Sequence, residues 1–104
     1  MSKQSLQVIT AELFEKTKKI RLTEVAALQS TANQRALQDL QQKAGMLAGA
    51  AKAAKPQTEL LALHEQTVAA LDTAGLLGII SNEELTQYYT YIDDIWTAIE
   101  GSAT

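Results

Sequence analysis

Hydrophobic residues recur at helical spacing along most of the chain. Near its beginning, Leu6, Ile9, Leu13 and Ile20 stand three, four and seven residues apart, with Phe14 beside them. This period places apolar side chains along one side of a helix. We therefore expect an amphipathic helix from about residue 2 to residue 20.

A second helix is expected from a capping signal and a long apolar seam. Thr31 and Gln34 have the spacing of a capping box, which predicts a helix start near Ala32, whereas the preceding segment 22–29 fits either a short helix or an interruption. The apolar positions that follow alternate three and four residues apart: Leu37, Leu40, Ala44, Leu47, Ala51 and Ala54. A repeat of about 3.5 residues is typical of a seam that packs along another helix.

Small residues and a proline mark the end of this second helix. Gly45 and Gly49 are spaced for the close approach of a neighbour, which we interpret as packing inside a bundle. Pro56 is expected to end the helix, because it disfavours helical geometry at Lys55, and to lie in the first turn of the next one.

Two further helices complete the pattern. The third has its apolar side chains at Leu60, Leu61, Leu63, Val68 and Leu71. It is expected to stop at Gly75, a residue suited to the left-handed position that often follows a helix. The run 76–80 is short, apolar and interrupted by glycine, so we interpret it as a buried connection rather than a strand.

The strongest local signal precedes the fourth helix. Ser81 and Glu84 form a capping box, and Ile80 is placed to contact Leu85. The apolar stripe of the helix then comprises Leu85, Tyr88, Ile92, Ile95 and Ile99, and Gly101 is expected to close it. Short connections between four helices predict an all-α, antiparallel four-helix bundle that forms a single domain over residues 1–104.

Composition supports this reading and suggests a compartment. The chain has no cysteine, and helix-favouring residues outnumber its five glycines and one proline. It has neither a signal-peptide pattern nor the roughly 20 consecutive apolar residues of a membrane span. Packing without disulfides suits a reducing compartment, so we expect a cytoplasmic protein.

Charge divides the chain into two halves. All nine Lys and Arg residues precede Pro56, whereas eight of the twelve carboxylates follow it, giving charges of +5 and −8. The two halves could simply attract each other within one bundle. Alternatively, the acidic half receives a cationic peptide or protein that long-range charge steers toward it.

Side chains that carry chemistry are sparse. His64 is the sole histidine, and Leu61 stands where a di-iron bundle would need a glutamate, so we expect His64 to be an ordinary side chain at the edge of the core. No base stands beside a serine or threonine, and no metal or cofactor motif is present. We expect neither catalysis nor a bound cofactor; an unrecognised enzyme would need a deep polar pocket.

Nucleic acid is not the expected partner. The turn before the fourth helix resembles a helix-turn-helix in outline, but the helix that would enter the major groove has five acids and no base. Basic residues cluster instead at the end of the first helix: Lys16, Lys18, Lys19 and Arg21. Such a cluster is typical of a solvated helix end, with contact to nucleic acid or to an anionic membrane surface as the functional alternative.

The fourth helix carries four of the five aromatic residues. Tyr88, Tyr89 and Trp96 are expected at the edge of the core, whereas Tyr91 falls on the opposite side beside Asp94, either as a harmless surface residue or as a partner contact. The candidate partner-binding residues are Glu83, Glu84, Tyr91, Asp94 and Trp96.

The segments Gln7–Phe14 (QVITAELF) and Ile80–Leu85 (ISNEEL), in a chain of this length, resemble the small bacteriocin immunity proteins of lactic acid bacteria. The resemblance implies an antiparallel four-helix bundle, no catalysis, cytoplasmic residence in the producing cell, and protection against a cationic pore-forming peptide that acts through a membrane receptor complex. It also implies that the C-terminal part, here Leu76 through Ile99, selects the bacteriocin.

A different class of function fits the same pattern. A small helical regulatory or structural subunit could associate with itself or with another protein through the apolar seam that runs from Leu37 to Ala54. The two hypotheses predict different contacts. A self-associating subunit would dimerise through the second helix, whereas an immunity protein would meet its partner through the third and fourth helices.

Overall fold

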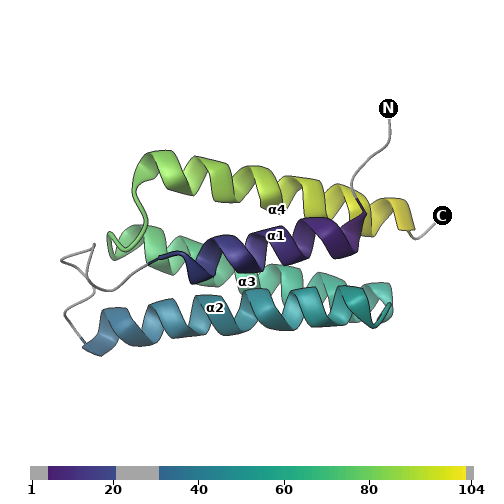
Figure 1. Ribbon diagram of the computed structural model, residues 1–104, viewed down its shortest axis with the longest axis horizontal. Helices are drawn as coiled ribbons and strands as arrows, with labels where there is room; N and C mark the ends of the chain where they lie inside the picture. Colours follow the sequence, from purple (N-terminus) through teal and green to yellow (C-terminus); the bar gives the residue numbers. More distant parts are fainter. Residues whose placement is uncertain (1–4, 21–30, 103–104) are drawn as a thin grey trace.

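Four helices account for most of residues 5–20 and 31–102, the part of the chain that the computed structural model describes: α1 (Leu6–Lys18), α2 (Thr31–Lys52), α3 (Gln57–Leu76) and α4 (Asn82–Ser102). Successive helices run antiparallel, and α1 packs against both α2 and α4, while α3 packs against the same two helices from the other side (Figure 1). The described residues contain no β-strand. The expected all-α, antiparallel four-helix bundle is therefore confirmed.

The apolar stripes of the four helices meet in one core. Leu13 of α1, Leu40 and Leu47 of α2, Leu71 of α3 and Ile95 of α4 have no exposed surface. Around them lie further buried side chains from the predicted stripes: Ile9, Leu37, Ala44, Ala51, Leu60, Tyr88, Ile92 and Ile99. Burial of these stripes away from water is the main source of stability in such a bundle.

The second helix begins close to where its sequence predicts, whereas the first begins at Leu6, four residues later than expected. Ser5 caps α1, because its hydroxyl accepts a hydrogen bond from the Val8 amide at 3.3 Å. The expected start of this helix near Ser2 and the open segment 22–29 lie outside the described residues. Helix α2 begins at Thr31, one residue before the expected Ala32.

The apolar seam of α2 ends one step earlier than predicted. Its members from Leu37 to Ala51 are buried, but Ala54 is exposed and lies beyond the end of the helix, with a φ of 55°. The amide of Lys55 donates to the carbonyl of Ala50 at 3.0 Å, which is the bond that closes a Schellman motif. The prediction for Ala54 was wrong because the helix turns left-handed there, toward Pro56.

Replacing this left-handed alanine with glycine should stabilise the fold. A left-handed conformation costs an L-residue about 1–2 kcal/mol, and the greater flexibility of glycine in the unfolded chain offsets about 0.4–1 kcal/mol of that. We therefore expect Ala54→Gly to raise the free energy of unfolding, measured by urea denaturation, by roughly 0.5–1 kcal/mol. Ala53→Gly is the matched control and should lower it, since φ at Ala53 is not positive; equal changes in both variants would contradict the motif.

The connection between α3 and α4 corrects two expectations about Gly75, which was expected to end the helix and to take the left-handed position. Helix α3 continues through Gly75 to Leu76, and the left-handed residue is Gly78, with a φ of 76°. At Gly75 a Cβ atom would lie 2.8 Å from a methyl carbon of Leu85, so the glycine lets that side chain pack closely against α3 and does not form the turn. Ile79 and Ile80 are buried as expected.

The first two residues of the 76–80 run are not buried. Leu76 is 89% exposed and Leu77 is 40% exposed, so only the second half of the run is the buried connection that its apolar sequence predicts. The reason is that α3 extends to Leu76, which places this side chain on the outer side of the helix's last turn.

The other helix ends depart from prediction at Pro56 and at Gly101. Pro56 immediately precedes α3 as its cap residue, so the expectation that it lies in the first turn of that helix was wrong by one position. Ser81 Oγ accepts a hydrogen bond from the Glu84 amide at 3.2 Å, which confirms the serine half of the predicted capping box. Gly101 lies inside α4, which continues to Ser102, so the expectation that this glycine closes the helix was wrong.

Only one of the two spaced glycines in α2 serves close packing. A Cβ atom at Gly45 would lie 3.0 Å from the Phe14 ring of α1, whereas one at Gly49 would meet nothing within 4 Å. The Gly45 part of the packing interpretation is thus confirmed and the Gly49 part is wrong. Among the described residues, no helix combines the length and the apolar character needed to cross a membrane.

Candidate functional site

Helix α4 has two flanks, since α1 packs against one side of its buried stripe and α3 against the other (Figure 1). All of its charged residues are acidic, and the sequence from Pro56 onward contains no Lys or Arg. The two flanks differ in the residues that their neighbouring helices contribute.

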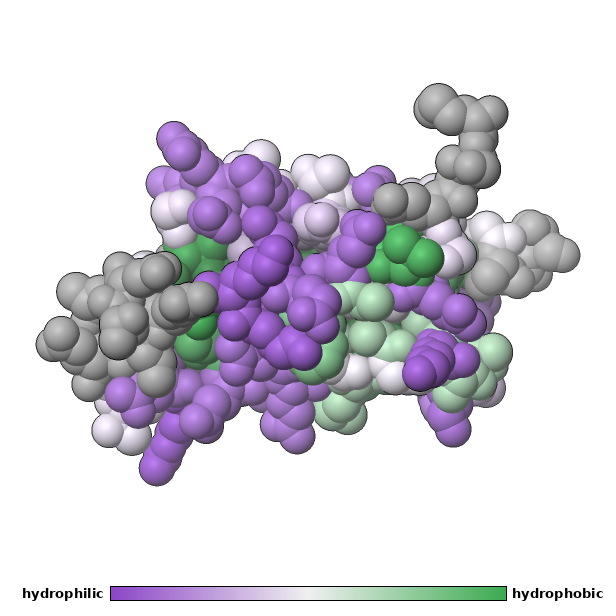
Figure 2. Space-filling model, viewed as in Figure 1, coloured by the Kyte–Doolittle hydropathy of each residue, from purple (hydrophilic) through white to green (hydrophobic). Residues whose placement is uncertain are grey.

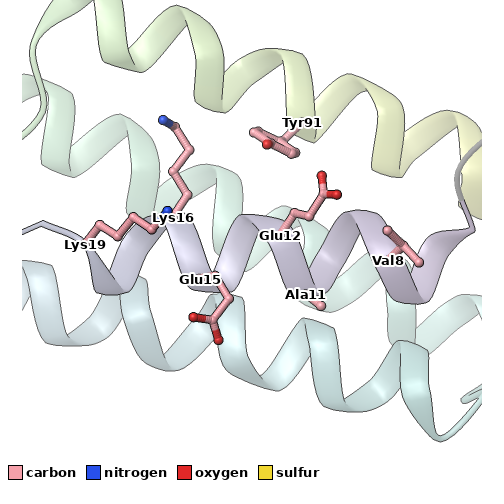
Figure 3. A pocket seen from close by; sticks show the side chains of 7 residues that line it. All are labelled: Val8, Ala11, Glu12, Glu15, Lys16, Lys19 and Tyr91. Carbon is pink, nitrogen blue, oxygen red and sulfur yellow. The ribbon is translucent and has the colours of Figure 1, made fainter.

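The flank toward α1 forms an open groove of about 490 Å³ that Val8, Glu12, Lys16 and Lys19 line from α1 and Tyr91 from α4. In Figure 3 the side chains of Glu12 and Lys16 extend from α1 toward α4, and the Tyr91 ring lies next to α4, above Glu12. An adjoining hollow of about 400 Å³ continues along Tyr91 and Asp94. We call this surface, lined by these six residues, the α1–α4 groove.

The groove is mixed in charge. Figure 2 shows that hydrophilic residues dominate the face of the molecule that includes α1 and α4, with hydrophobic residues visible in smaller patches. Lys16 and Lys19 line the first hollow together with Glu12, and Asp94 lines the adjoining one. Because charges of both signs are interspersed, the groove has no strong preference for a cationic or an anionic partner.

Tyr91 does not occupy the position that the sequence predicts. Its side chain is half-buried and packs against the core, instead of standing exposed on the opposite side of α4. The residue lies three positions after Tyr88 and four before Ile95, so it shares the edge of their stripe. The packing of α1 against that edge covers part of the ring.

Lys16 joins the basic and acidic halves of the chain. Its Nζ atom lies 3.5 Å from a carboxylate oxygen of Glu84, 3.0 Å from Oε1 of Gln87 and 5.1 Å from the centre of the Tyr88 ring. Such a partly exposed ion pair contributes about 0–1 kcal/mol. The predicted attraction between the halves therefore operates at this contact, and Glu84 already has a cationic partner within the chain.

The basic cluster at the end of α1 is similarly engaged. Lys18 lies 3.0 Å from a carboxylate oxygen of Glu15, and its Nζ atom is 4.5 Å from the centre of the Phe14 ring. Arg21 lies outside the described residues. Contacts within the protein thus occupy Lys16 and Lys18, as expected for a solvated helix end.

Side chains from other helices cap the end of α1, a feature that sequence reasoning missed. The Tyr88 hydroxyl donates to the carbonyl of Lys16 at 3.1 Å, and the Gln41 amide donates to the carbonyl of Thr17 at the same distance. The last carbonyls of a helix have no partner within the helix. Tyr88 is buried, and burial raises the pKa of its hydroxyl, with the Glu84 carboxylate acting in the same direction.

Stability should fall in strongly alkaline solution because of Tyr88. A raised pKa in the folded state means that the unfolded chain loses the tyrosine proton first, at a pH of about 10. The contribution of this residue is complete below that pH and is lost above it, at up to about 1.4 kcal/mol per pH unit. Urea denaturation from pH 9 to 11 should show a shallower decline in Tyr88→Phe than in the unchanged protein, whereas equal slopes would contradict the assignment.

The flank toward α3 centres on Trp96 and His64. The Trp96 side chain is 44% exposed, and its ring centre lies 5.5 Å from that of His64, with the two ring planes tilted by 49°. His64 is buried, with its Nε2 atom 3.1 Å from the carbonyl oxygen of Ile92. His64 therefore lies at the edge of the core, as expected.

A second contact crosses the same flank. The hydroxyl of Tyr89 donates a hydrogen bond to the carboxylate of Asp72. This bond raises the pKa of Tyr89, and partial burial adds to the effect. The outer sides of α3 and α4 are thus joined at a second position, between Asp72 and Tyr89, as well as between His64 and Trp96.

The structure does not bring the five candidate partner-binding residues together. Glu84, Tyr91 and Asp94 lie toward α1, whereas Trp96 lies toward α3. Glu83 is exposed in the first turn of α4. The five residues therefore do not form one surface.

Leu76 and Leu77 are exposed residues that sequence reasoning assigned to the interior. One signal could have identified Leu76, since it stands four residues after the polar Asp72 and hence shares its side of the helix. Among the described residues, no group of three or more His, Cys, Asp or Glu side chains is arranged to hold a metal ion.

Comparison with protein-family models, with curated proteins and with solved structures finds no match to this chain.

Proposed function

We propose that this protein is a non-enzymatic binding protein that receives a cationic peptide on its acidic α3–α4 hairpin, and that it acts in the cytoplasm as a bacteriocin immunity protein. The observation that carries the proposal is the charge of the hairpin: residues 56–104 contain eight carboxylates and no Lys or Arg. All eight acidic residues are exposed. Their field attracts a cationic partner from a distance and repels nucleic acid.

The fold supports this proposal by holding the acidic residues on a rigid scaffold. The buried stripes of α3 and α4 share the core with α1 and α2, so the outer surfaces of the hairpin are fixed relative to each other. A surface that is ordered before binding loses less entropy when a peptide docks on it. Cationic pore-forming peptides combine positive charge with apolar side chains, and the hairpin offers the complement of both.

Protection of living cells tests this proposal. The protein, expressed in a bacteriocin-sensitive lactic acid bacterium, should protect it against one class within a panel of cationic bacteriocins. Neutralising four acids of α4, with Glu83→Gln, Glu84→Gln, Asp93→Asn and Asp94→Asn, should abolish that protection. These side chains are exposed, so the fold should persist by circular dichroism.

A control variant removes two acids from the other half of the chain. Glu15→Gln and Asp39→Asn neutralise residues paired with Lys18 and Lys43, and they should leave protection intact. Protection that survives the α4 changes would contradict a role for the acidic hairpin. An absence of protection against every peptide, with soluble protein present in the cell, would contradict the immunity function.

The alternative function is a regulatory or structural subunit that associates through the α2 seam. That seam is not on the surface of the bundle. From Leu37 to Ala51 the members of the seam are buried against helices of the same chain. A second copy could not reach them without opening the bundle. This observation favours the peptide-binding proposal over self-association through α2.

A further inference from the structure

We infer that the cationic partner docks on the side of α4 that faces α3, as an amphipathic helix whose apolar side covers Trp96. This surface, the α3–α4 face, consists of Glu65, Val68 and Asp72 on α3 and of Tyr89, Asp93 and Trp96 on α4. The inference rests on the proposed function and selects one of the two flanks of α4 for it.

Two contacts show that these residues share one side of the bundle. The rings of His64 and Trp96 lie 5.5 Å apart, and Tyr89 donates to Asp72, so both contacts join α3 to α4. Val68 stands four residues after His64 and four before Asp72, and it is half-buried against the core. Glu65 lies seven residues, or two helical turns, before Asp72, so it is on the same side of α3. Asp93 is four residues after Tyr89 and three before Trp96.

Trp96 provides the apolar anchor of this surface. It is 44% exposed although it is the largest side chain of the protein, and the buried ring of His64 supports it from behind. Tryptophan residues that a partner desolvates often contribute more to binding than their neighbours do. Leu76 is 89% exposed and lies four residues after Asp72, so it adds a second exposed apolar side chain near the turn between α3 and α4.

The charges on this face have a single sign. Glu65, Asp72 and Asp93 are exposed acids, Glu100 lies one turn beyond Trp96, and neither helix contributes a Lys or Arg. The α1–α4 groove differs, since Lys16 and Lys19 line it and offset the charge of its carboxylates, which leaves less attraction for a cationic partner. The apolar residues of the α3–α4 face, Val68 and Trp96, are thus surrounded by negative charge alone. A helical peptide with lysines on both sides of an apolar stripe should therefore bind this face in preference to the α1–α4 groove.

The sole tryptophan makes this surface directly observable. The probe is an 18-residue helical peptide of leucine and lysine only, about 27 Å long and hence comparable with α3. Its titration into the full chain should shift Trp96 fluorescence to shorter wavelength in a saturable way, because the ring leaves water. A peptide with glutamate in place of lysine, at the same positions, should cause no shift.

Two pairs of substitutions locate the contact, and each pair removes two negative charges. Glu65→Gln with Asp93→Asn should weaken binding of the leucine–lysine peptide by about tenfold, since both acids flank Trp96. Glu12→Gln with Asp94→Asn alters the α1–α4 groove instead and should change the affinity by less than about twofold. Trp96→Ala removes the fluorophore, so its binding is measured by calorimetry. This substitution should weaken binding of the leucine–lysine peptide by at least about tenfold.

The outcomes separate this inference from the proposed function. If the Glu12 and Asp94 pair weakens binding and the Glu65 and Asp93 pair does not, the partner uses the α1–α4 groove, and the inference is wrong while the function stands. If cells are protected but Trp96 fluorescence does not respond to the cationic peptide, the inference is again wrong and the proposed function stands. A fluorescence shift with the expected substitution pattern, without cell protection, supports the surface and contradicts the immunity function.

Discussion

Replacing Tyr88 with alanine is expected to lower the free energy of unfolding by about 3–5 kcal/mol, the range for loss of a large buried aromatic side chain. The Tyr88 side chain is 1% exposed, so its removal leaves a cavity between α1 and α4. The substitution also removes the hydroxyl that donates to the carbonyl of Lys16. Urea denaturation followed by far-UV circular dichroism measures the change.

Tyr88→Phe is the matched control, since it keeps the ring and removes only the hydrogen bond. Such a bond contributes about 0.5–1.5 kcal/mol, so this variant should remain folded and lose no more than that. A loss in Tyr88→Ala that is no larger than in Tyr88→Phe would mean that the ring does not fill the core, and the packing of α1 against α4 would then be wrong.

Replacing Leu47 with alanine is expected to cost about 2–5 kcal/mol of unfolding free energy. Leu47 has no exposed surface and lies in the middle of the α2 seam. Its neighbour Met46 is 44% exposed, so Met46→Ala should cost less than about 1 kcal/mol at the next position of the same helix. Similar losses in both variants would contradict the rotational position of α2.

The Leu47 experiment also tests where the seam is used. Because the seam is buried within one chain, the urea midpoint of the unchanged protein and of Leu47→Ala should not depend on protein concentration. A midpoint that rises with concentration, and a Leu47→Ala defect that higher concentration relieves, would show that two copies share the seam and would revive the self-association hypothesis.

The helix ends show where prediction from sequence succeeds. Ser81 caps α4 as predicted, because a serine hydroxyl satisfies a nearby backbone amide without help from the rest of the fold. The glycines mislead, since Gly75 lies within α3 and Gly101 within α4. Glycine suits either a left-handed turn or close packing, and only the position of Leu85 against Gly75 distinguishes these roles.

In the candidate site, too, the sequence predicts some features and not others. Sequence alone placed the acids and aromatic rings on the last helix, and the helical period indicates which side chains of that helix face the core. The side of α4 that each residue shares with α1 or with α3 depends on how the helices are arranged around the core. For that reason the expectation that Tyr91 would be exposed was wrong, and Trp96 came to lie apart from Glu84 and Asp94.

By itself, the sequence determined the number and approximate extent of the helices, the buried stripes and the separation of charge, because these depend on spacing and residue type along one chain. Tertiary structure alone decided which helices are neighbours, and so which polar groups meet. Tyr88 caps α1 and Lys16 pairs with Glu84 because these partners, about 70 residues apart in the chain, come together only when the core closes. Contacts of such long range have no local signature, since their energy arises only after all four helices pack.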